Sequence, residues 1–135
     1  IGNGGKLYTP HLVRKKVDVN GNVTETEIKY RETTAKLSTI KAVQKGMVAV
    51  ANSQDGTAVE IFKDFPFDVA GKTGTAETAQ KGKQSSNALF VCYAPADDPE
   101  IAVAVVVEKG VRGAFTAPIA KDVLTAYFNL KDQTN

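Results

Sequence analysis

The chain of 135 residues has no tryptophan and only one cysteine, one methionine and one histidine. A single cysteine, Cys92, excludes an internal disulfide framework and a multi-cysteine metal site. No apolar run approaches the roughly 20 residues that span a bilayer, and the longest candidate, Ile101 to Val107, has the length of a strand. Neither sign of charge dominates, since 17 Lys and Arg face 15 Asp and Glu. Nucleic-acid-binding proteins usually show a clustered basic face, so we expect no nucleic-acid partner.

The remaining composition is that of an ordinary globular domain. Hydrophobic residues make up 42% of the chain and charged residues 24%, close to the globular average, and the length suits one domain. The chain begins with Ile1, and Gly2-Asn3-Gly4-Gly5 is typical of a helix end, because glycine and asparagine tolerate left-handed backbone. We therefore expect residues 1–135 to be the C-terminal portion of one domain of a longer protein.

The N-terminal half predicts a β-hairpin followed by a helix. Asn20-Gly21-Asn22 separates two strand-like segments, and Asn-Gly supplies the positive backbone angles of a tight turn, so we expect a hairpin over residues 11–30. Apolar residues spaced by three and four predict a helix over residues 37–52. Ser38 is a candidate N-cap of this helix. Gly46 inside it suggests close packing, because glycine weakens a helix by about 1 kcal/mol relative to alanine.

The C-terminal half predicts an antiparallel sheet over residues 67–108, with a covering helix over residues 117–130 that Thr116 caps. The middle strand lacks alternation, so we expect it to be central and buried on both faces. Thr78 to Ser86 is polar and predicts a loop. This order of elements predicts an α+β fold. The three expected strands are 67–75, 88–93 and 101–108.

The segment Gly71-Lys72-Thr73-Gly74-Thr75 is unusual for a strand. Glycine within a strand suggests that a ligand or another backbone approaches closely, and a lysine with two threonine hydroxyls can bind an anion. A phosphate-binding P-loop would need glycine five residues before Gly71, where Pro66 stands. A lysine on an edge strand can prevent pairing with another chain. This interpretation explains Lys72 but neither the glycines nor the threonines.

Residues Gly71 to Glu77 resemble the Lys-Thr-Gly motif of penicillin-binding protein transpeptidases, particularly those of class B. The resemblance covers nearly the whole chain, except the hairpin from Arg14 to Tyr30. It implies a partial transpeptidase domain that contains three strands of the family's five-stranded sheet, with helices packed on it. Further segments that match the family in order are Asn3-Gly4-Gly5, Tyr8-Thr9-Pro10, Gly46-Met47-Val48, Gly56-Thr57-Ala58 and Tyr93-Ala94-Pro95.

The resemblance also implies one wall of an active site. In such enzymes an upstream serine attacks a D-alanyl-D-alanine stem peptide to form an acyl-enzyme, and β-lactams mimic that peptide. Lys72 would support the electrostatics of the site and attract the terminal carboxylate. The hydroxyls of Thr73 and Thr75 would donate to that carboxylate, and the amide of Thr75 would form part of the oxyanion hole. Substrate would pair with the strand edge at Gly74. The family implies neither cofactor nor metal.

The nucleophile motif of the family, Ser-x-x-Lys, is absent from its expected place. Ser38 precedes Lys41 by three residues, but it lies downstream of where the family nucleophile belongs. Ser85-Ser86-Asn87 has the form of the second motif, Ser-x-Asn, but follows Lys72 instead of preceding it. We therefore expect this chain alone to be inactive, and to self-associate through the exposed edge of the strand at residues 101–108.

The resemblance places the parent protein on the extracytoplasmic side of a bacterial membrane, anchored by an N-terminal segment. Two other interpretations remain open. One is a fragment of a β-lactam sensor or a β-lactamase from the same superfamily. The other is a non-catalytic module that binds peptides along the edge of the strand at residues 67–75. Penicillin labelling of the full-length protein separates the last interpretation, because a binding module is never acylated.

Overall fold

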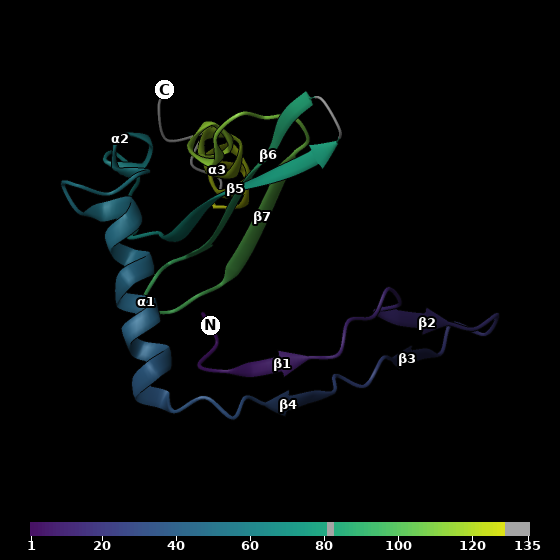
Figure 1. Ribbon diagram of the computed structural model, residues 1–135. Coiled ribbons are helices and arrows are strands. Elements are labelled where there is room, and N and C mark those ends of the chain that lie inside the picture. Colours follow the sequence, from purple (N-terminus) through teal and green to yellow (C-terminus); the bar gives the residue numbers. More distant parts are fainter. Residues whose placement is uncertain (81–82, 129–135) are drawn as a thin grey trace, which may run out of the picture.

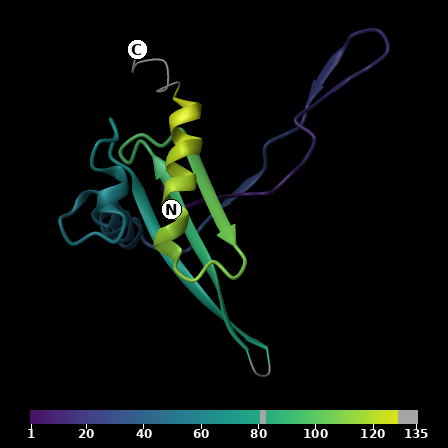
Figure 2. The ribbon, with the colours of Figure 1, turned by 90° about the horizontal axis from the view of Figure 1, so that it is seen from above.

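A two-stranded arm over residues 6–32 projects from the body of the protein in the computed structural model, which describes residues 1–80 and 83–128 (Figures 1 and 2). At its tip, the Asp18 carboxylate accepts hydrogen bonds from the backbone N–H groups of Asn20 and Asn22, and Gly21 has φ +83°. The hairpin near the N-terminus is therefore confirmed, and its pairing reaches back to Lys6. Its antiparallel pairs are β1 (Lys6–Tyr8) with β4 (Tyr30–Glu32) and β2 (Lys15–Val17) with β3 (Val23–Glu25).

Helix α1 (Leu37–Asn52) occupies the range that its apolar spacing predicts. The N-cap is Lys36, and no side chain caps the helix, so the prediction that Ser38 caps it is wrong. A Cβ atom added to Gly46 would meet nothing within 4 Å, so the predicted close packing there is also wrong. The C-terminal end of α1 is the part tied to the body, because the Asn52 side-chain amide donates to the carbonyl of Val69 at 2.8 Å.

Three strands form one antiparallel sheet in sequential order, as predicted. Gly71 lies opposite Cys92, and Ala88 lies opposite both Thr75 and Val107. Strand β6 is therefore central in the sheet, while β5 and β7 are its edges. The strands are β5 (Ala70–Gln80), β6 (Lys83–Ala94) and β7 (Ile101–Val107).

Five of the six predicted strand boundaries differ from those in the structure, two of them by a single residue, since β6 ends at Ala94 and β7 ends at Val107. The first strand begins at Ala70 instead of Phe67, because pairing with β6 begins at Ala70, opposite Tyr93. The Phe67 ring packs instead against Phe128, with centroids 4.8 Å apart. The loop predicted from Thr78 to Ser86 is mostly strand, since β5 continues to Gln80 and β6 begins at Lys83. Polarity is a poor indicator of a loop here, because a two-stranded ribbon can be polar on both faces and threonine favours strands.

The core lies on the face of β6 that carries Phe90, Cys92 and Ala94. Helix α2 (Val59–Phe62) places Phe62 over Phe90, with stacked rings 5.9 Å apart, and helix α3 (Ala117–Tyr127) contributes the fully buried Leu124. The opposite face of the sheet is open at Val91 and Val106, which are 42% and 60% exposed. The prediction that the middle strand is buried on both faces is therefore wrong.

A 3-10 helix, η1 (Gly113–Thr116), leads into α3. Thr116 occupies the N-cap position of α3, but its hydroxyl donates to the carbonyl of Gly113 at 2.7 Å, so the predicted side-chain cap is wrong. The described part of α3 ends at Tyr127, and residues 129 and 130 of the predicted helix lie outside the described residues.

Burial of the Cys92 thiol gives the core a measurable pH dependence. Cys92 is 3% exposed, and burial raises its pKa from 9.0 to about 11. The folded protein therefore keeps the thiol neutral at pH values where the unfolded chain ionises it. As the pH rises from about 9 to 11, ionisation of the thiol therefore favours the unfolded chain. We expect the free energy of unfolding to fall by about 2–3 kcal/mol over this range, and to be unaffected by the thiol below about pH 9.

Denaturant unfolding of the wild type and of Cys92→Ala at several pH values measures this effect. The variant loses the thiol and should show a shallower decline across the same pH range, although its stability at pH 7 is lower because a small cavity replaces the sulfur atom. Burial also raises the pKa of Tyr93. Tyr93 is present in both proteins, so it contributes equally to both curves. Parallel curves would contradict the prediction.

Candidate active site

A hollow of about 430 Å³ opens beside the first half of β5. The turn between α1 and α2 borders it on one side, and η1 borders it on another. Backbone hydrogen bonds fix that first turn, because Gly56 N–H donates to Ser53 and Ala58 N–H donates to Val50. The residues that line the hollow are Thr57, Thr73, Gly74, Thr75, Arg112, Gly113 and Ala114.

Three threonine hydroxyls lie along this hollow. Thr73 and Thr75 are two residues apart on β5, so their side chains share one face of the strand. The hydroxyls of Thr57 and Thr73 are hydrogen-bonded at 3.3 Å. The Thr75 oxygen accepts a hydrogen bond from the Gly113 N–H at 3.3 Å, which leaves its own O–H free to donate to a ligand. The arrangement offers oriented donors to an anion.

The two glycines of the motif have different surroundings. A Cβ atom on Gly71 would lie 2.8 Å from the Phe90 ring, so Gly71 serves the core. At Gly74 a Cβ atom would make only an ordinary contact with Leu89 at 3.4 Å. The close approach at Gly74 comes from Gly113, where an added Cβ atom would stand 2.2 Å from the Gly74 carbonyl oxygen. The backbone of η1 therefore packs directly against the backbone of β5.

Lys72 lies apart from the threonines that the sequence groups with it. It is exposed and pairs with Val91, while Thr73 pairs with Phe90, so the two side chains leave opposite faces of β5. Lys72 is not among the residues that line the hollow, and its ammonium donates to the carbonyl of Thr73. Of the four predicted site residues, the structure brings Thr73, Gly74 and Thr75 together at the hollow.

Strand β5 has a free edge in the described part of the chain, since β6 is its one partner there. Alternate residues of such an edge present N–H and C=O groups away from the sheet, where an extended peptide can pair with them. The predicted use of this strand as a peptide-binding edge fits the topology. The role of the Thr75 amide in an oxyanion hole remains a prediction.

Sequence reasoning missed Arg112 and Gly113 as members of the site and gave Thr57 no role. A signal was available, because Lys109-Gly110-Val111-Arg112-Gly113 combines glycines with cationic residues directly after a strand. The same combination singled out residues 71–75. That η1 then packs against Gly74, however, depends on the tertiary fold.

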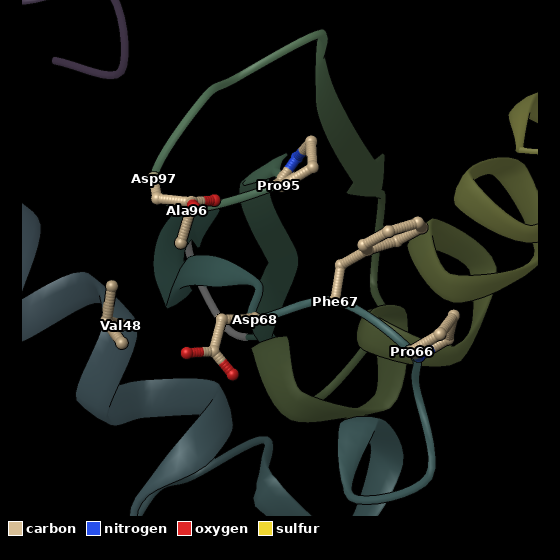
Figure 3. A pocket seen from close by; sticks show the side chains of 7 residues that line it. All are labelled: Val48, Pro66, Phe67, Asp68, Pro95, Ala96 and Asp97. Atoms are coloured by element: carbon tan, nitrogen blue, oxygen red, sulfur yellow. The ribbon is translucent and has the colours of Figure 1, made fainter.

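A second hollow, of about 520 Å³, lies between α1 and the chain before β5 (Figure 3). Two carboxylates, those of Asp68 and Asp97, border it, and Figure 3 shows Asp68 on the side that faces Val48 of α1. It lacks the hydroxyl donors of the first hollow. Its other lining residues are Pro66, Phe67, Pro95 and Ala96.

Residues 1–80 and 83–128 contain no cluster of three or more His, Cys, Asp or Glu side chains that could hold a metal ion. None of the helices described in these ranges is long and apolar enough to cross a membrane.

Comparison with known proteins identifies relatives over most of the chain. Peptidoglycan D,D-transpeptidase MrdA of Haemophilus influenzae is 32% identical over 94% of this chain, and penicillin-binding protein 2A of Bacillus subtilis is 35% identical over 98%. The chain spans about a fifth of the length of these relatives, 22% and 21% respectively.

Solved structures show the same fold. The D,D-transpeptidase domain of a peptidoglycan glycosyltransferase from Eggerthella lenta superposes with a TM-score of 0.78 at 31% identity, over 96% of this chain and 30% of that one. Penicillin-binding protein A of M. tuberculosis, solved as an imipenem acyl-enzyme complex, gives 0.76 at 28% identity, over 94% of this chain and 28% of that one. The family described as penicillin binding protein transpeptidase domain matches residues 1–125. Because this match leaves only the last ten residues outside it, the chain belongs to the penicillin-binding protein transpeptidase domain family.

Proposed function

We propose that this chain forms the Lys-Thr-Gly wall of the active site of a bacterial peptidoglycan D,D-transpeptidase. The observation that carries the proposal is the hollow in which Thr73, Gly74 and Thr75 meet beside the free edge of β5. Relatives of the chain bear the name peptidoglycan D,D-transpeptidase. One structural neighbour, described as an imipenem acyl-enzyme complex, shows that such a protein reacts covalently with a β-lactam.

In the proposed mechanism, the stem peptide lies antiparallel to β5 and places its terminal carboxylate in the hollow. The hydroxyls of Thr73 and Thr75 donate to that carboxylate, while a serine from another part of the full-length protein attacks the penultimate carbonyl carbon. The Thr75 N–H and the N–H of that serine stabilise the negative oxygen of the tetrahedral intermediate. The terminal D-alanine leaves, and the amine of a second stem peptide then releases the acyl group. Lys72, on the other face of β5, would supply positive charge toward the serine side of the site.

The open face of the sheet supports the view that further protein covers it. Val91 and Val106 are exposed there, together with Ala102 and Ala104. Contiguous apolar surface on a soluble domain usually marks an interaction site. We propose that the remainder of the transpeptidase domain packs on this face. The full-length protein would act on the extracytoplasmic side of the membrane, where its substrate lies, held by an N-terminal anchor.

The alternatives predict different behaviour of the full-length protein. A β-lactam sensor or a β-lactamase would also be acylated, but a sensor would carry transmembrane helices linked to a cytoplasmic module, and a β-lactamase would hydrolyse the adduct rapidly. A non-catalytic peptide-binding module would never be acylated. A stable penicillin adduct together with transfer to an amine acceptor supports the transpeptidase.

The 135-residue chain itself should not react with penicillin. None of its serines stands in the expected motif and order, so incubation with excess fluorescent penicillin should leave its intact mass unchanged, while the full-length protein gains one adduct. Sedimentation equilibrium of the untreated chain tests the expected self-association through the edge of β7, which has no partner strand in residues 1–80 and 83–128. A stoichiometric adduct on the isolated chain would contradict the proposed source of the nucleophile.

A further inference from the structure

The chain between β7 and η1 places Arg112 among the residues that line the hollow. After Val107, the backbone turns through two non-glycine residues with positive φ, Lys109 at +57° and Val111 at +67°. The Arg112 N–H then donates to the carbonyl of Gly110 at 2.8 Å. The next residue, Gly113, touches the backbone of β5, so the Cα atom of Arg112 is held one residue away from that contact.

Arg112 is the charged member of the seven residues that line the hollow, and three of the others carry hydroxyls. The side chain of Arg112 is exposed, and its guanidinium makes no hydrogen bond or ion pair with any residue in the described ranges. The family resemblance implies that Lys72 attracts the carboxylate, but the Lys72 side chain leaves the opposite face of β5 and donates to the Thr73 carbonyl. Among the residues that line the hollow beside Thr73 and Thr75, Arg112 is therefore the one that carries positive charge.

We propose that Arg112 is a specificity-determining residue that binds the carboxylate of the stem peptide or the β-lactam in this hollow. The inference rests on the proposed function. The planar guanidinium offers two parallel N–H groups that match a carboxylate, an arrangement that the ammonium of a lysine cannot reproduce. The hydroxyls of Thr73 and Thr75 fix the position of the ligand oxygens, and Arg112 supplies the charge that selects an anion over a neutral ligand.

The test compares two acylating agents that differ only in this charge: benzylpenicillin and its methyl ester. In the full-length protein, Arg112→Ala should slow acylation by benzylpenicillin about 10- to 100-fold, the range expected when a hydrogen bond to a charged group is lost. Acylation by the ester should be slower than that by benzylpenicillin in the wild type, and Arg112→Ala should change it less than about twofold. The rate of acylation by benzylpenicillin in Arg112→Lys should lie between those of the wild type and Arg112→Ala, because lysine keeps the charge but lacks the two parallel N–H groups of the guanidinium.

Arg31→Ala is the matched control, since it removes the same charge from an exposed position on β4, outside the hollow. It should leave both rates unchanged, and all variants should melt at the wild-type temperature. Equal losses with benzylpenicillin and the ester in Arg112→Ala, or no loss with either, would overturn the assignment of Arg112 while leaving the proposed function intact. Failure of benzylpenicillin to acylate the wild-type full-length protein would instead overturn both.

Discussion

Replacing Gly113 by alanine should lower the free energy of unfolding by about 3 kcal/mol, the upper end of the range for overpacking. The new Cβ atom would stand 2.2 Å from the Gly74 carbonyl oxygen and 2.6 Å from that of Leu89. Both are backbone atoms of paired strands, so neither can move aside as a flexible side chain could. Relief would require η1 to shift away from β5, and that shift would break the hydrogen bond from Gly113 to Thr75.

Gly46→Ala provides the matched control, because it makes the same chemical change in the middle of α1, where the added atom meets nothing within 4 Å. This variant should be more stable than the wild type by about 1 kcal/mol, since alanine is the better helix former. Denaturant unfolding followed by far-ultraviolet circular dichroism measures both values. A Gly113→Ala protein as stable as the wild type would show that the backbone of η1 does not pack closely against the sheet.

Lys72→Ala in the full-length protein should slow acylation by benzylpenicillin at least about 100-fold. This is the loss of rate expected when one preorganised electrostatic interaction is removed from an active site. The fold should persist, because Lys72 is exposed and its ammonium contacts only the neighbouring carbonyl among the described residues. Lys72 acts on the serine side of β5 in the proposed mechanism. The loss should therefore be similar for benzylpenicillin and its methyl ester, in contrast to Arg112→Ala.

Lys45→Ala, on the exposed surface of α1, removes an equal charge outside the site and should acylate at the wild-type rate. Stopped-flow measurement of acylation gives the rates, and melting curves show that each variant is folded. An unchanged rate in a folded Lys72→Ala protein would refute the role of Lys72. If Lys72→Ala slowed acylation by benzylpenicillin but not by its methyl ester, Lys72 would instead be the residue that binds the ligand carboxylate.

The sequence predicted the elements whose signals are local. Helix α1 follows from apolar spacing, and the order of the sheet follows from short connections between apolar segments, because neighbouring strands tend to pair. The tip of the arm follows from Asn-Gly, which the structure uses as expected, with Gly21 at positive φ. The motif at residues 71–75 also marked the strand that borders the hollow.

The features that the sequence could not reveal depend on contacts between distant segments. Thr116 has the chemistry of a helix cap, yet its hydroxyl bonds to Gly113 because η1 lies within reach. Lys72 and Thr73 are neighbours in the motif, but strand alternation sends them to opposite faces. Arg112 lies 37 residues beyond Thr75, and only the antiparallel course of β5, β6 and β7 returns it to the same hollow.

The arm should open independently of the sheet. Nearly every residue from 6 to 32 is exposed, and its cross-strand support is lateral, such as the Tyr8 and Tyr30 rings 5.6 Å apart. A two-stranded ribbon without a buried face is marginally stable by itself. Amide hydrogens of β2 and β3 should therefore exchange with solvent through local opening, whereas those of β6 should exchange only when the sheet itself unfolds. Substitutions at Gly113 and Cys92 should therefore change the free energy of unfolding of the sheet and its helices. They should leave the local opening of the arm unchanged.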